Sequence, residues 1–277
     1  MSVIKAFILG LIQGISEFLP ISSSGHLAIA GKLMGMNPEA DSLLSFNILL
    51  HVATLVAVFI VYKNDIWEMI KAFFAMIGDV FKGKGLRLSE FTYRRLIIML
   101  IAATLPAVVA ALLLGDIIEN PALWQIGIFL IITAILLFLS EKLAGGNIDI
   151  EKMSVKRAFC VGCFQGLGTL PGISRSGSTI VGGLFCGLNK ATAVRFSFLM
   201  SIPAILGALV LDIKDMFSAT SQTLSLLPVA VGMLTAAISG YFAIKFLLKI
   251  VEKSKLSYFS IYCTIAGIIA IVLNFTI

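Results

Sequence analysis

Charged residues are scarce in this chain of 277 residues. Asp, Glu, Lys and Arg make up 13% of it, whereas the apolar residue types make up 59%, and the mean hydropathy is +1.04. A surface surrounded by water needs far more charge than this, so the composition excludes a soluble enzyme. It also excludes a disordered chain, which would be polar and rich in charge.

Cysteine is scarce as well, with four residues in the whole chain. All four lie in apolar surroundings and are expected to be small buried side chains rather than parts of a disulfide framework. The Cys160-x-x-Cys163 spacing is typical of redox and zinc sites. No second cysteine pair or His stands nearby, so we expect neither kind of site.

The N-terminal segment lacks the small-residue cleavage site of a signal peptide. It is apolar from Ala6 to Ile15 and runs directly into Glu17 and Pro20. We therefore expect this segment to be retained in the mature protein.

Six apolar stretches are long enough to cross a bilayer as helices, which takes roughly 17 to 25 residues. They are residues 43–62, 96–115, 122–140, 196–211, 224–244 and 256–277. The fourth is short and is expected to extend back through Val194. Residues 65–78 mix charged and aromatic side chains at helical spacing, so we expect an interfacial helix there rather than a seventh span.

Two further apolar regions, residues 3–36 and 158–188, are each interrupted by Pro, Gly and Ser. The interruptions are Pro20-Ile-Ser-Ser-Ser-Gly25 and Pro171-Gly-Ile-Ser-Arg-Ser-Gly177. Non-helical backbone at membrane depth survives only where protein or a water-filled cavity satisfies its polar groups. We therefore expect two re-entrant helix-loop-helix hairpins, whose tips are candidate sites.

The two interrupted regions resemble each other in sequence. Gly10-x-x-Gln13-Gly14 recurs as Gly162-x-x-Gln165-Gly166, Leu19-Pro20 as Leu170-Pro171, and Ser22-Ser23-Ser24-Gly25 as Ser174-Arg175-Ser176-Gly177. We expect one integral membrane domain over residues 1–277, with two repeats at about 1–140 and 158–277. Each repeat is a hairpin followed by three spans, and an odd number of crossings makes the second repeat enter from the opposite side. The expected fold class is an all-α polytopic membrane protein with two inverted repeats.

The basic residues set the expected orientation. The chain has 21 Lys and Arg residues. One side of the predicted membrane holds only Lys5, Lys32 and Lys214, and Arg175 lies inside an interruption. All others lie on the opposite side, which is therefore expected to be cytoplasmic. Both termini then face outward, the first hairpin enters from outside, and the second enters from the cytoplasm. Basic segments between apolar spans also indicate membrane loops rather than a surface that binds nucleic acid.

Four ionisable side chains lie at membrane depth, where such groups are costly and are functional candidates. Glu17 and His26 flank the first interruption, Arg175 lies in the second, and His51 lies in the first full span. Simpler interpretations exist for each. The Ser-Gly clusters could be only helix caps and turns, Glu17 and Arg175 could be a buried ion pair between the hairpins, and the lone His51 is expected to be a satisfied core residue.

The residue types together favour a site for a phosphate or another oxyanion. The helix that follows each interruption points unpaired N–H groups at the same region. Arg175 adds a planar fork that can bind phosphate through two N–H groups. A carboxylate opposes anion binding, so Glu17 indicates a metal ion or proton transfer. This combination is closer to hydrolysis than to a stored ion pair.

At these residues the chain resembles a known family. Gln13-x-x-x-Glu17-Phe-Leu-Pro-Ile-Ser-Ser-Ser-Gly-His26 and Pro171-Gly-Ile-Ser-Arg-Ser-Gly-Ser-Thr179 look like the two signature segments of the undecaprenyl-diphosphate phosphatases, or bacitracin resistance proteins. The resemblance covers essentially the whole chain in length, repeat layout and number of spans. The family has Glu or Gln at the position of Gln13, and the amide here puts in doubt a mechanism that needs two carboxylates.

The resemblance implies that the terminal phosphate of undecaprenyl diphosphate is removed with the help of a divalent cation, Mg²⁺ or Ca²⁺. The product is the lipid carrier used in peptidoglycan synthesis, and its recycling confers resistance to bacitracin. It also implies the cell inner (plasma) membrane as location, with a pocket open to the external face. The sequence leaves the oligomeric state open, a homodimer included.

The roles of the site residues are hypotheses. Arg175 grips the diphosphate and stabilises charge on the transferred group. Ser23 is the nucleophile, with His26 as general base and acid, and Glu17 binds the metal or orients His26. Direct attack by water, with Ser23 only positioning it, stays open. Contacts to the substrate are assigned to Gln13, Ser22, Ser24, Ser174, Ser176 and Thr179.

A lipid transporter or flippase is the alternative function, because inverted repeats with broken helices also build transporters. An enzyme releases phosphate in detergent, whereas a carrier needs a sealed membrane. A second family of membrane lipid phosphatases combines Ser-Gly-His with a Ser-Arg segment, but it needs a His shortly after that segment. No His follows Arg175 in this chain, so that family is not favoured.

Overall fold

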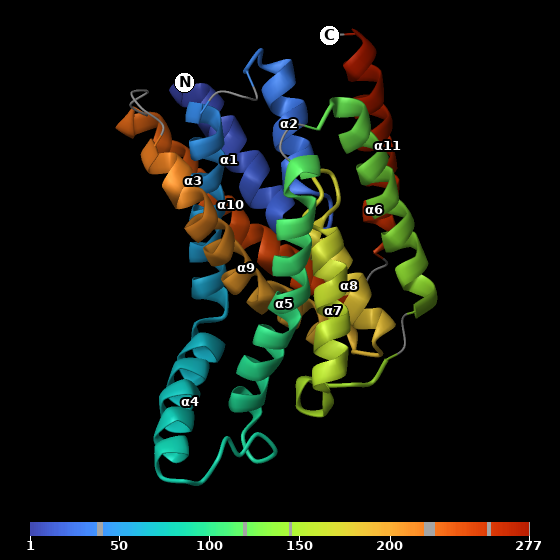
Figure 1. Cartoon of the computed structure of the whole chain (residues 1–277). Coiled ribbons are helices and arrows are strands. Elements are labelled where there is room, and N and C mark those ends of the chain that lie inside the picture. Colours follow the sequence, from blue (N-terminus) through green and yellow to red (C-terminus); the bar gives the residue numbers. More distant parts are fainter. Residues whose placement is uncertain (38–40, 119–120, 144–145, 219–224, 254–255, 277) are drawn as a thin grey trace.

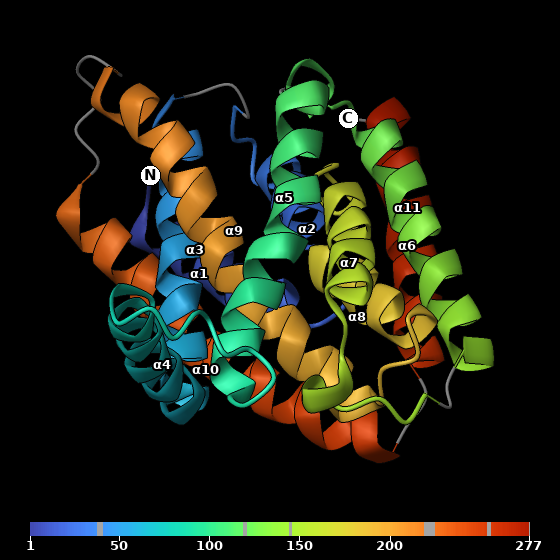
Figure 2. The same ribbon diagram turned by 60° about the horizontal axis from the view of Figure 1, so that its bottom comes forward.

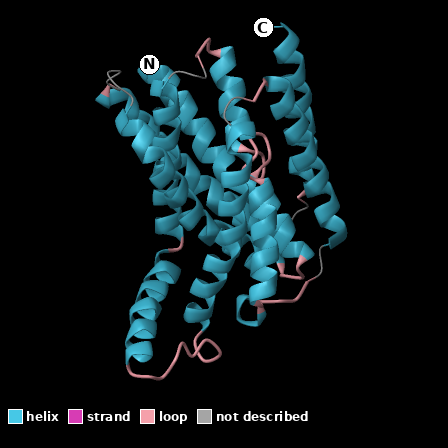
Figure 3. Cartoon of the chain, viewed as in Figure 1, coloured by secondary structure: helices cyan, strands magenta, loops and turns pink. Residues whose placement is uncertain are grey.

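The computed structural model of the chain describes residues 1–37, 41–118, 121–143, 146–218, 225–253 and 256–276. Within these ranges the protein is all-helical and has no strand (Figure 3), apart from one isolated bridge between Ile148 and Leu188. The helices in chain order are α1 (Val3–Phe18), α2 (Ser23–Leu33), α3 (Asp41–Val61), α4 (Lys63–Phe81), α5 (Thr92–Ile118), α6 (Leu123–Leu143), the short 3₁₀ helix η1 (Ile150–Lys152), α7 (Val155–Leu167), α8 (Arg175–Phe185), α9 (Lys190–Ser218), α10 (Leu226–Lys253) and α11 (Ser257–Thr276).

Six of these helices are long and apolar enough to cross a membrane, as the sequence predicts. Their apolar stretches are Ser42–Val61, Thr92–Leu114, Leu123–Lys142, Lys190–Val210, Leu226–Val251 and Ser257–Thr276. Helices α5 and α9 begin earlier than predicted and α10 ends later, because the basic residues that flank their apolar cores continue the helix. The predicted span ends at residues 224 and 277 lie outside the described residues. The chain is a multi-pass membrane protein.

The distribution of apolar side chains matches a lipid environment. Large apolar residues are exposed on the outside of the bundle, among them Leu112, Leu113, Leu226, Phe242 and Ile261. Patches of this extent are unfavourable in water and are solvated in lipid. The buried core lies inside the bundle, where the ring of Phe18 at the end of α1 packs edge-on against Phe198 of α9 at 5.5 Å between centroids. The core therefore supports the loop that follows α1.

Two pairs of helices stop near the middle of the bundle. Figure 1 shows both chain termini at one end of the bundle, while α4 extends from the other end. Helix α1 runs inward from the end that holds the termini and α2 returns to it; α7 and α8 do the same from the α4 end. Helix α1 packs on α10, α7 packs on α5, and α6 packs on α11; Figure 2 shows α6 and α11 side by side at one edge.

The first pair is broken by a proline and restarted by a serine cap. Helix α1 ends at Phe18, two residues before Pro20, and α2 starts after Ser22, whose Oγ accepts a hydrogen bond from the Gly25 N–H at 3.3 Å. Ser22 has φ +71°, in the left-handed region that residues with a side chain rarely adopt. Such a conformation costs on the order of 1–3 kcal/mol. The cap hydrogen bond and the surrounding contacts hold it in place.

The second pair is broken in a similar way, with glycine at the strained position. Helix α7 ends at Leu167, and Gly172 has φ +104°. A Cβ at Gly172 would lie 2.6 Å from the Ile126 carbonyl oxygen, so no other residue fits. The Ser174 Oγ then caps α8 by accepting from the Gly177 N–H at 3.0 Å. The interpretation of the serines as helix caps is thus confirmed for Ser22 and Ser174.

Helix α4 covers the predicted interfacial segment and is not among the candidate spans. Near its start, Asp65 receives hydrogen bonds at 2.5 and 3.1 Å from the Arg195 guanidinium. Near its end, Asp79 receives one at 2.7 Å from Arg94, and this bond holds the pKa of the Asp79 carboxyl below its usual range. Two ion pairs therefore fasten the two ends of α4 to the bundle.

Candidate functional site

The loops of the two broken helix pairs contact each other. The Gly172 N–H donates to the Ser24 Oγ at 3.3 Å, and the Ser176 Oγ donates to the Leu19 carbonyl at 3.2 Å. These bonds join positions about 150 residues apart in the sequence. The two tips, which the sequence marks as candidate sites, lie together in the structure. We call this region the tip cluster: residues 17–26 and 172–179.

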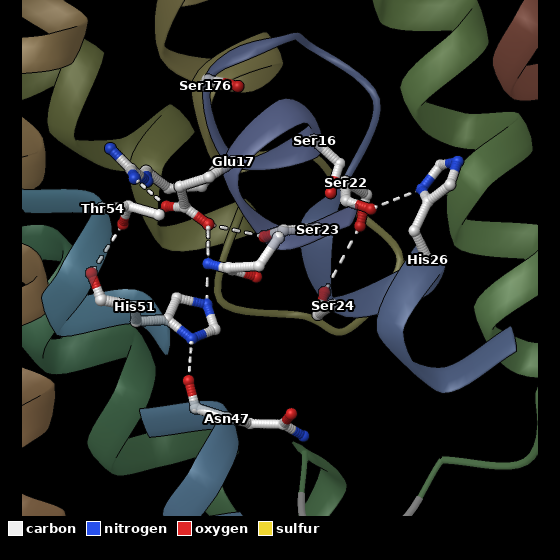
Figure 4. Close-up of polar contacts among 12 residues, drawn as sticks. Ser16, Glu17, Ser22, Ser23, Ser24, His26, Asn47, His51, Thr54 and Ser176 are labelled. Atoms are coloured by element: carbon white, nitrogen blue, oxygen red, sulfur yellow. Dashed lines mark hydrogen bonds and ion pairs between the residues drawn. The ribbon is translucent and has the colours of Figure 1, made fainter. Parts of the chain in front are cut away.

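The carboxylate of Glu17 is surrounded by polar side chains (Figure 4). Its Oε1 accepts a hydrogen bond from Arg175 Nη2, which closes an ion pair between the two helix pairs. Its Oε2 accepts from Ser23 Oγ at 2.6 Å and from Gln13 Nε2 at 3.0 Å, and lies 3.5 Å from His51 Nε2. The Glu17 side chain is 5% exposed. Helices α1, α2, α3 and α8 thus all supply polar groups to one buried carboxylate.

Ser23 is oriented by this carboxylate. It is the first residue of α2, and its hydroxyl donates to Glu17 Oε2. A hydroxyl whose proton already points at a carboxylate can lose that proton as its oxygen attacks an electrophile. Of the predicted site residues, Ser23 and Glu17 therefore have the geometry of a nucleophile and its base.

His26 points away from Ser23 and Glu17 (Figure 4). Its Nδ1 lies 2.7 Å from the Ser22 carbonyl oxygen and its Nε2 lies 2.8 Å from the Tyr262 Oη. The ring also stacks on Tyr262 of α11, with 5.4 Å between centroids. A carbonyl only accepts, so Nδ1 carries the hydrogen and Nε2 accepts from Tyr262. The structure does not bring together Ser23 and His26, which the sequence pairs as nucleophile and base, and the catalytic role of His26 stays a prediction.

Arg175 keeps a donor free for a ligand. Its Nη2 binds Glu17, whereas its Nη1 is buried and has no hydrogen-bond partner among the described residues. A buried unpaired N–H group costs about 1–3 kcal/mol, and more when it is charged. An anion such as a phosphate oxygen satisfies it at once. The predicted contact between Arg175 and a phosphate therefore has a donor available for it.

The predicted serine ligands are paired within each tip. Ser22 and Ser24 lie 3.3 Å apart between their Oγ atoms, and Ser174 and Ser176 lie 3.2 Å apart. Ser22, Ser174 and Ser176 are buried, whereas Ser24 is half-buried. Ser24 is thus the most open of the four hydroxyls.

Thr179 lies deeper, on the second turn of α8. It is fully buried, its Oγ1 is 2.9 Å from the Arg175 carbonyl oxygen, and it is 2.5 Å from the Ser197 Oγ of α9. Its hydroxyl is therefore used in fastening α8 to α9. Its predicted contact to the substrate stays a prediction.

The structure adds two residues to the predicted set. His51, which the sequence leaves aside as a core residue, is 33% exposed and reaches Glu17 from α3. The signal that could have found it was available, because an ionisable residue within a span is a functional candidate by default. Tyr262 carries no such signal; it is a tyrosine in an apolar span and is found only through its contact with His26.

The donors at the tip cluster fit a divalent cation whose coordination a bound substrate completes. Within the described ranges, no group of three or more His, Cys, Asp or Glu side chains could hold a metal ion. Glu17 offers a carboxylate, and the buried Gln13 Oε1 has no hydrogen-bond partner in the described part of the chain. Mg²⁺ is commonly held by one or two carboxylates plus the phosphates of a substrate. The residues fit a cation that a diphosphate would share.

Comparison with known proteins gives a consistent result. The sequence model of a family described as bacitracin resistance protein BacA matches residues 6–269. A protein of Alkaliphilus metalliredigens named undecaprenyl-diphosphatase is 46% identical over 276 residues, which is 99% of either chain. A protein of the same name from Methanosphaera stadtmanae is 42% identical over 99% of either chain. Another from Methanobrevibacter smithii is 40% identical over 97% of this chain and 96% of its own length. The similarity extends over both tips.

Proposed function

Since the chain belongs to the bacitracin resistance protein BacA family, we propose that it hydrolyses undecaprenyl diphosphate to undecaprenyl phosphate and inorganic phosphate. The reaction returns the lipid carrier to peptidoglycan synthesis, and it confers resistance to bacitracin by removing the diphosphate lipid. The observation that carries the proposal is the arrangement around Glu17: a hydroxyl held by the carboxylate, beside an arginine with a buried N–H donor that no described residue accepts.

Arg175 and the helix starts bind the diphosphate. The free Nη1 of Arg175 donates to an oxygen of the terminal phosphate and stabilises the charge that develops during transfer. Helices α2 and α8 both begin in the tip cluster, so their N-terminal N–H groups favour an anion there. The hydroxyl of Ser24 supplies a further donor.

Ser23 attacks the terminal phosphorus. As its Oγ forms the new bond, its proton passes to the Glu17 carboxylate, and the bond from phosphorus to the bridging oxygen breaks, so that undecaprenyl phosphate leaves. Water then attacks the phosphoserine; the serine oxygen takes back the proton from Glu17, and phosphate is released. In this mechanism the base is Glu17 rather than His26, because the Ser23 hydroxyl donates its hydrogen bond to Glu17.

A bound divalent cation, Mg²⁺ or Ca²⁺, would supply charge neutralisation on the diphosphate. Glu17 would hold it with its carboxylate, and Gln13 would offer its carbonyl oxygen in place of a second carboxylate. The Gln13 amide also donates to Glu17 at 3.0 Å and so orients the carboxylate towards Ser23.

The finer topology is also a proposal. Two inverted repeats, each a re-entrant hairpin followed by three spans, account for the reciprocal packing of α1 on α10 and of α7 on α5. They also account for the close contact of α6 with α11. A Cβ added at Gly127 would lie 2.6 Å from the Gly267 carbonyl oxygen, and a Cβ added at Gly267 would lie 2.7 Å from the Gly127 carbonyl oxygen. Such a two-way close approach is typical of elements related by a two-fold axis.

The excess of Lys and Arg at the α4 end supports an orientation with this end in the cytoplasm. Membership of the family supports the cell inner (plasma) membrane as location and a catalytic pocket open to the external face. A cysteine placed at residue 84, labelled by a thiol reagent that cannot cross membranes, should react only when the cytoplasmic side is accessible. Reaction in intact cells would contradict this orientation.

A homodimer stays a prediction, which the mass of the purified protein in detergent tests.

Phosphate release in detergent separates the enzyme from a lipid carrier. The purified protein is mixed with undecaprenyl diphosphate in detergent micelles, with Mg²⁺, with Ca²⁺ or with a chelator, and free phosphate is measured. We expect release that depends on the cation and needs no sealed membrane. If folded protein releases none under any of these conditions, the phosphatase proposal fails, and lipid movement in sealed vesicles becomes the function to test.

A further inference from the structure

A hydrogen bond to the backbone determines which ring nitrogen of His51 carries the hydrogen. Its Nδ1 lies 2.8 Å from the carbonyl oxygen of Asn47, one turn earlier on α3 (Figure 4). A carbonyl oxygen only accepts hydrogen bonds, so Nδ1 is the nitrogen that carries the hydrogen. The lone pair of the neutral ring is then on Nε2, and Nε2 is the atom that faces Glu17.

Two electron-rich atoms therefore face each other, one on the buried Glu17 and the other on the partly exposed His51. His51 Nε2 and Glu17 Oε2 are 3.5 Å apart. A charge-assisted hydrogen bond from a protonated ring to a carboxylate is shorter, at about 2.7–2.9 Å. The separation instead matches two ligands of one cation, each about 2.0–2.2 Å from it.

We propose that His51 Nε2 and Glu17 Oε2 bind one divalent cation, so that the metal site of this protein contains an imidazole ligand from α3. The hydrogen bond from His51 to the Asn47 carbonyl is the outer contact that metal-binding histidines almost always make, because it fixes the ring and its tautomer. The His51 side chain is 33% exposed, so a cation can reach Nε2. The inference rests on the proposed function only in that the diphosphate completes the coordination.

Gln13 supplies the third ligand. It is fully buried, its Nε2 donates to the same Glu17 oxygen at 3.0 Å, and its Oε1 has no hydrogen-bond partner in the described ranges. A half-turn of the amide exchanges these two atoms. It removes a donor that would compete with the cation for Glu17 Oε2 and presents a carbonyl oxygen in its place. The oxygen thereby gains a partner, and the NH₂ group takes the position that the oxygen held.

An imidazole ligand changes which cation the site prefers. Oxygen-only sites suit Ca²⁺ and Mg²⁺, whereas a nitrogen ligand favours first-row transition metals. The site is therefore expected to bind Mn²⁺ more tightly than Ca²⁺, and the preference should depend on His51. Mn²⁺ is also paramagnetic, which makes the ligand nitrogen directly observable.

Pulsed electron paramagnetic resonance of bound Mn²⁺ tests the assignment. The full-length protein in detergent is loaded with Mn²⁺ alone, and the echo modulation from a coordinated ¹⁴N nucleus is recorded. The chain has two histidines, so His26→Ala is the matched control for His51→Ala, and labelling with ¹⁵N-histidine identifies the ring nitrogen without any substitution.

We expect nitrogen modulation that changes on ¹⁵N labelling, persists in His26→Ala and is lost in His51→Ala. Loss of an outer contact alone weakens metal binding 10–100-fold, so removal of the ligand itself should weaken Mn²⁺ binding by about 100-fold or more. Absence of Mn²⁺ binding, bound Mn²⁺ without nitrogen modulation, or modulation lost in His26→Ala overturns the proposal. The readout does not involve phosphate release, so this inference and the proposed phosphatase activity can fail independently.

Discussion

Replacing Arg175 with alanine is expected to lower phosphate release from undecaprenyl diphosphate by about 10³-fold or more. Arg175 is the cation in the tip cluster with a buried N–H donor that no described residue satisfies, and loss of a charge-stabilising donor or arginine costs roughly 10²–10⁵ in rate. Arg175→Lys keeps the charge but not the planar fork, so we expect it to stay about 10²-fold below the wild type. The initial rate of phosphate release in detergent measures both.

The Arg175 substitutions also test the simpler interpretation of a purely structural ion pair. Removing Arg175 leaves the Glu17 carboxylate buried without its cation, which is expected to destabilise the fold by about 3–5 kcal/mol. Removing both charges in Glu17→Gln with Arg175→Met should restore most of that stability. The account predicts a stable double variant without activity. A double variant with near-normal phosphate release would mean that the pair only holds the tips together.

Replacing Ser23 with alanine is expected to lower phosphate release by about 10³-fold or more. The attacking oxygen is lost, and so is the hydrogen bond that orients it on Glu17, so a water molecule must attack instead. The substitution removes one hydroxyl at the start of α2. The rate is measured at saturating lipid, so that a change in substrate binding does not obscure the effect on the chemical step.

Ser16→Ala is the matched control for Ser23→Ala. Ser16 lies next to Glu17 in the chain and is buried, but its Oγ donates to the Ile12 carbonyl at 2.6 Å within α1. Its loss should leave the rate within about threefold of the wild type, since the hydrogen bond of its hydroxyl lies within its own helix. Equal rates for the two variants would remove Ser23 from the reaction.

Local sequence patterns were sufficient to predict the main features of the fold. Apolar length predicts the six spans, since a helix needs a fixed number of residues to cross a bilayer. Pro20 and the serine clusters predict where the helices break, because proline lacks an N–H donor and serine caps a helix start. Unpaired backbone groups are costly at membrane depth, so both tips are expected to be covered by other parts of the protein. In the structure the two tips cover each other.

The arrangement of the two histidines could not be predicted in this way. His26 follows Ser23 by three residues, a spacing that allows contact, but its ring is held by Tyr262, 236 residues away. His51 looks like an isolated residue in an apolar span, and its contact with Glu17 depends on how α3 packs beside α1. Contacts between helices far apart in sequence leave no periodic pattern, so the partners of both rings appear only in the structure.

The stereochemical course at the terminal phosphorus tests most directly whether the hydroxyl held by Glu17 is the attacking group. A prenyl diphosphate made chiral at that phosphorus with sulfur and oxygen isotopes is hydrolysed by the purified protein, and the configuration of the released thiophosphate is determined. Attack by Ser23 followed by attack of water consists of two in-line displacements, so the account predicts retention of configuration. Inversion would show a single direct attack by water and would contradict the role of Ser23 as nucleophile.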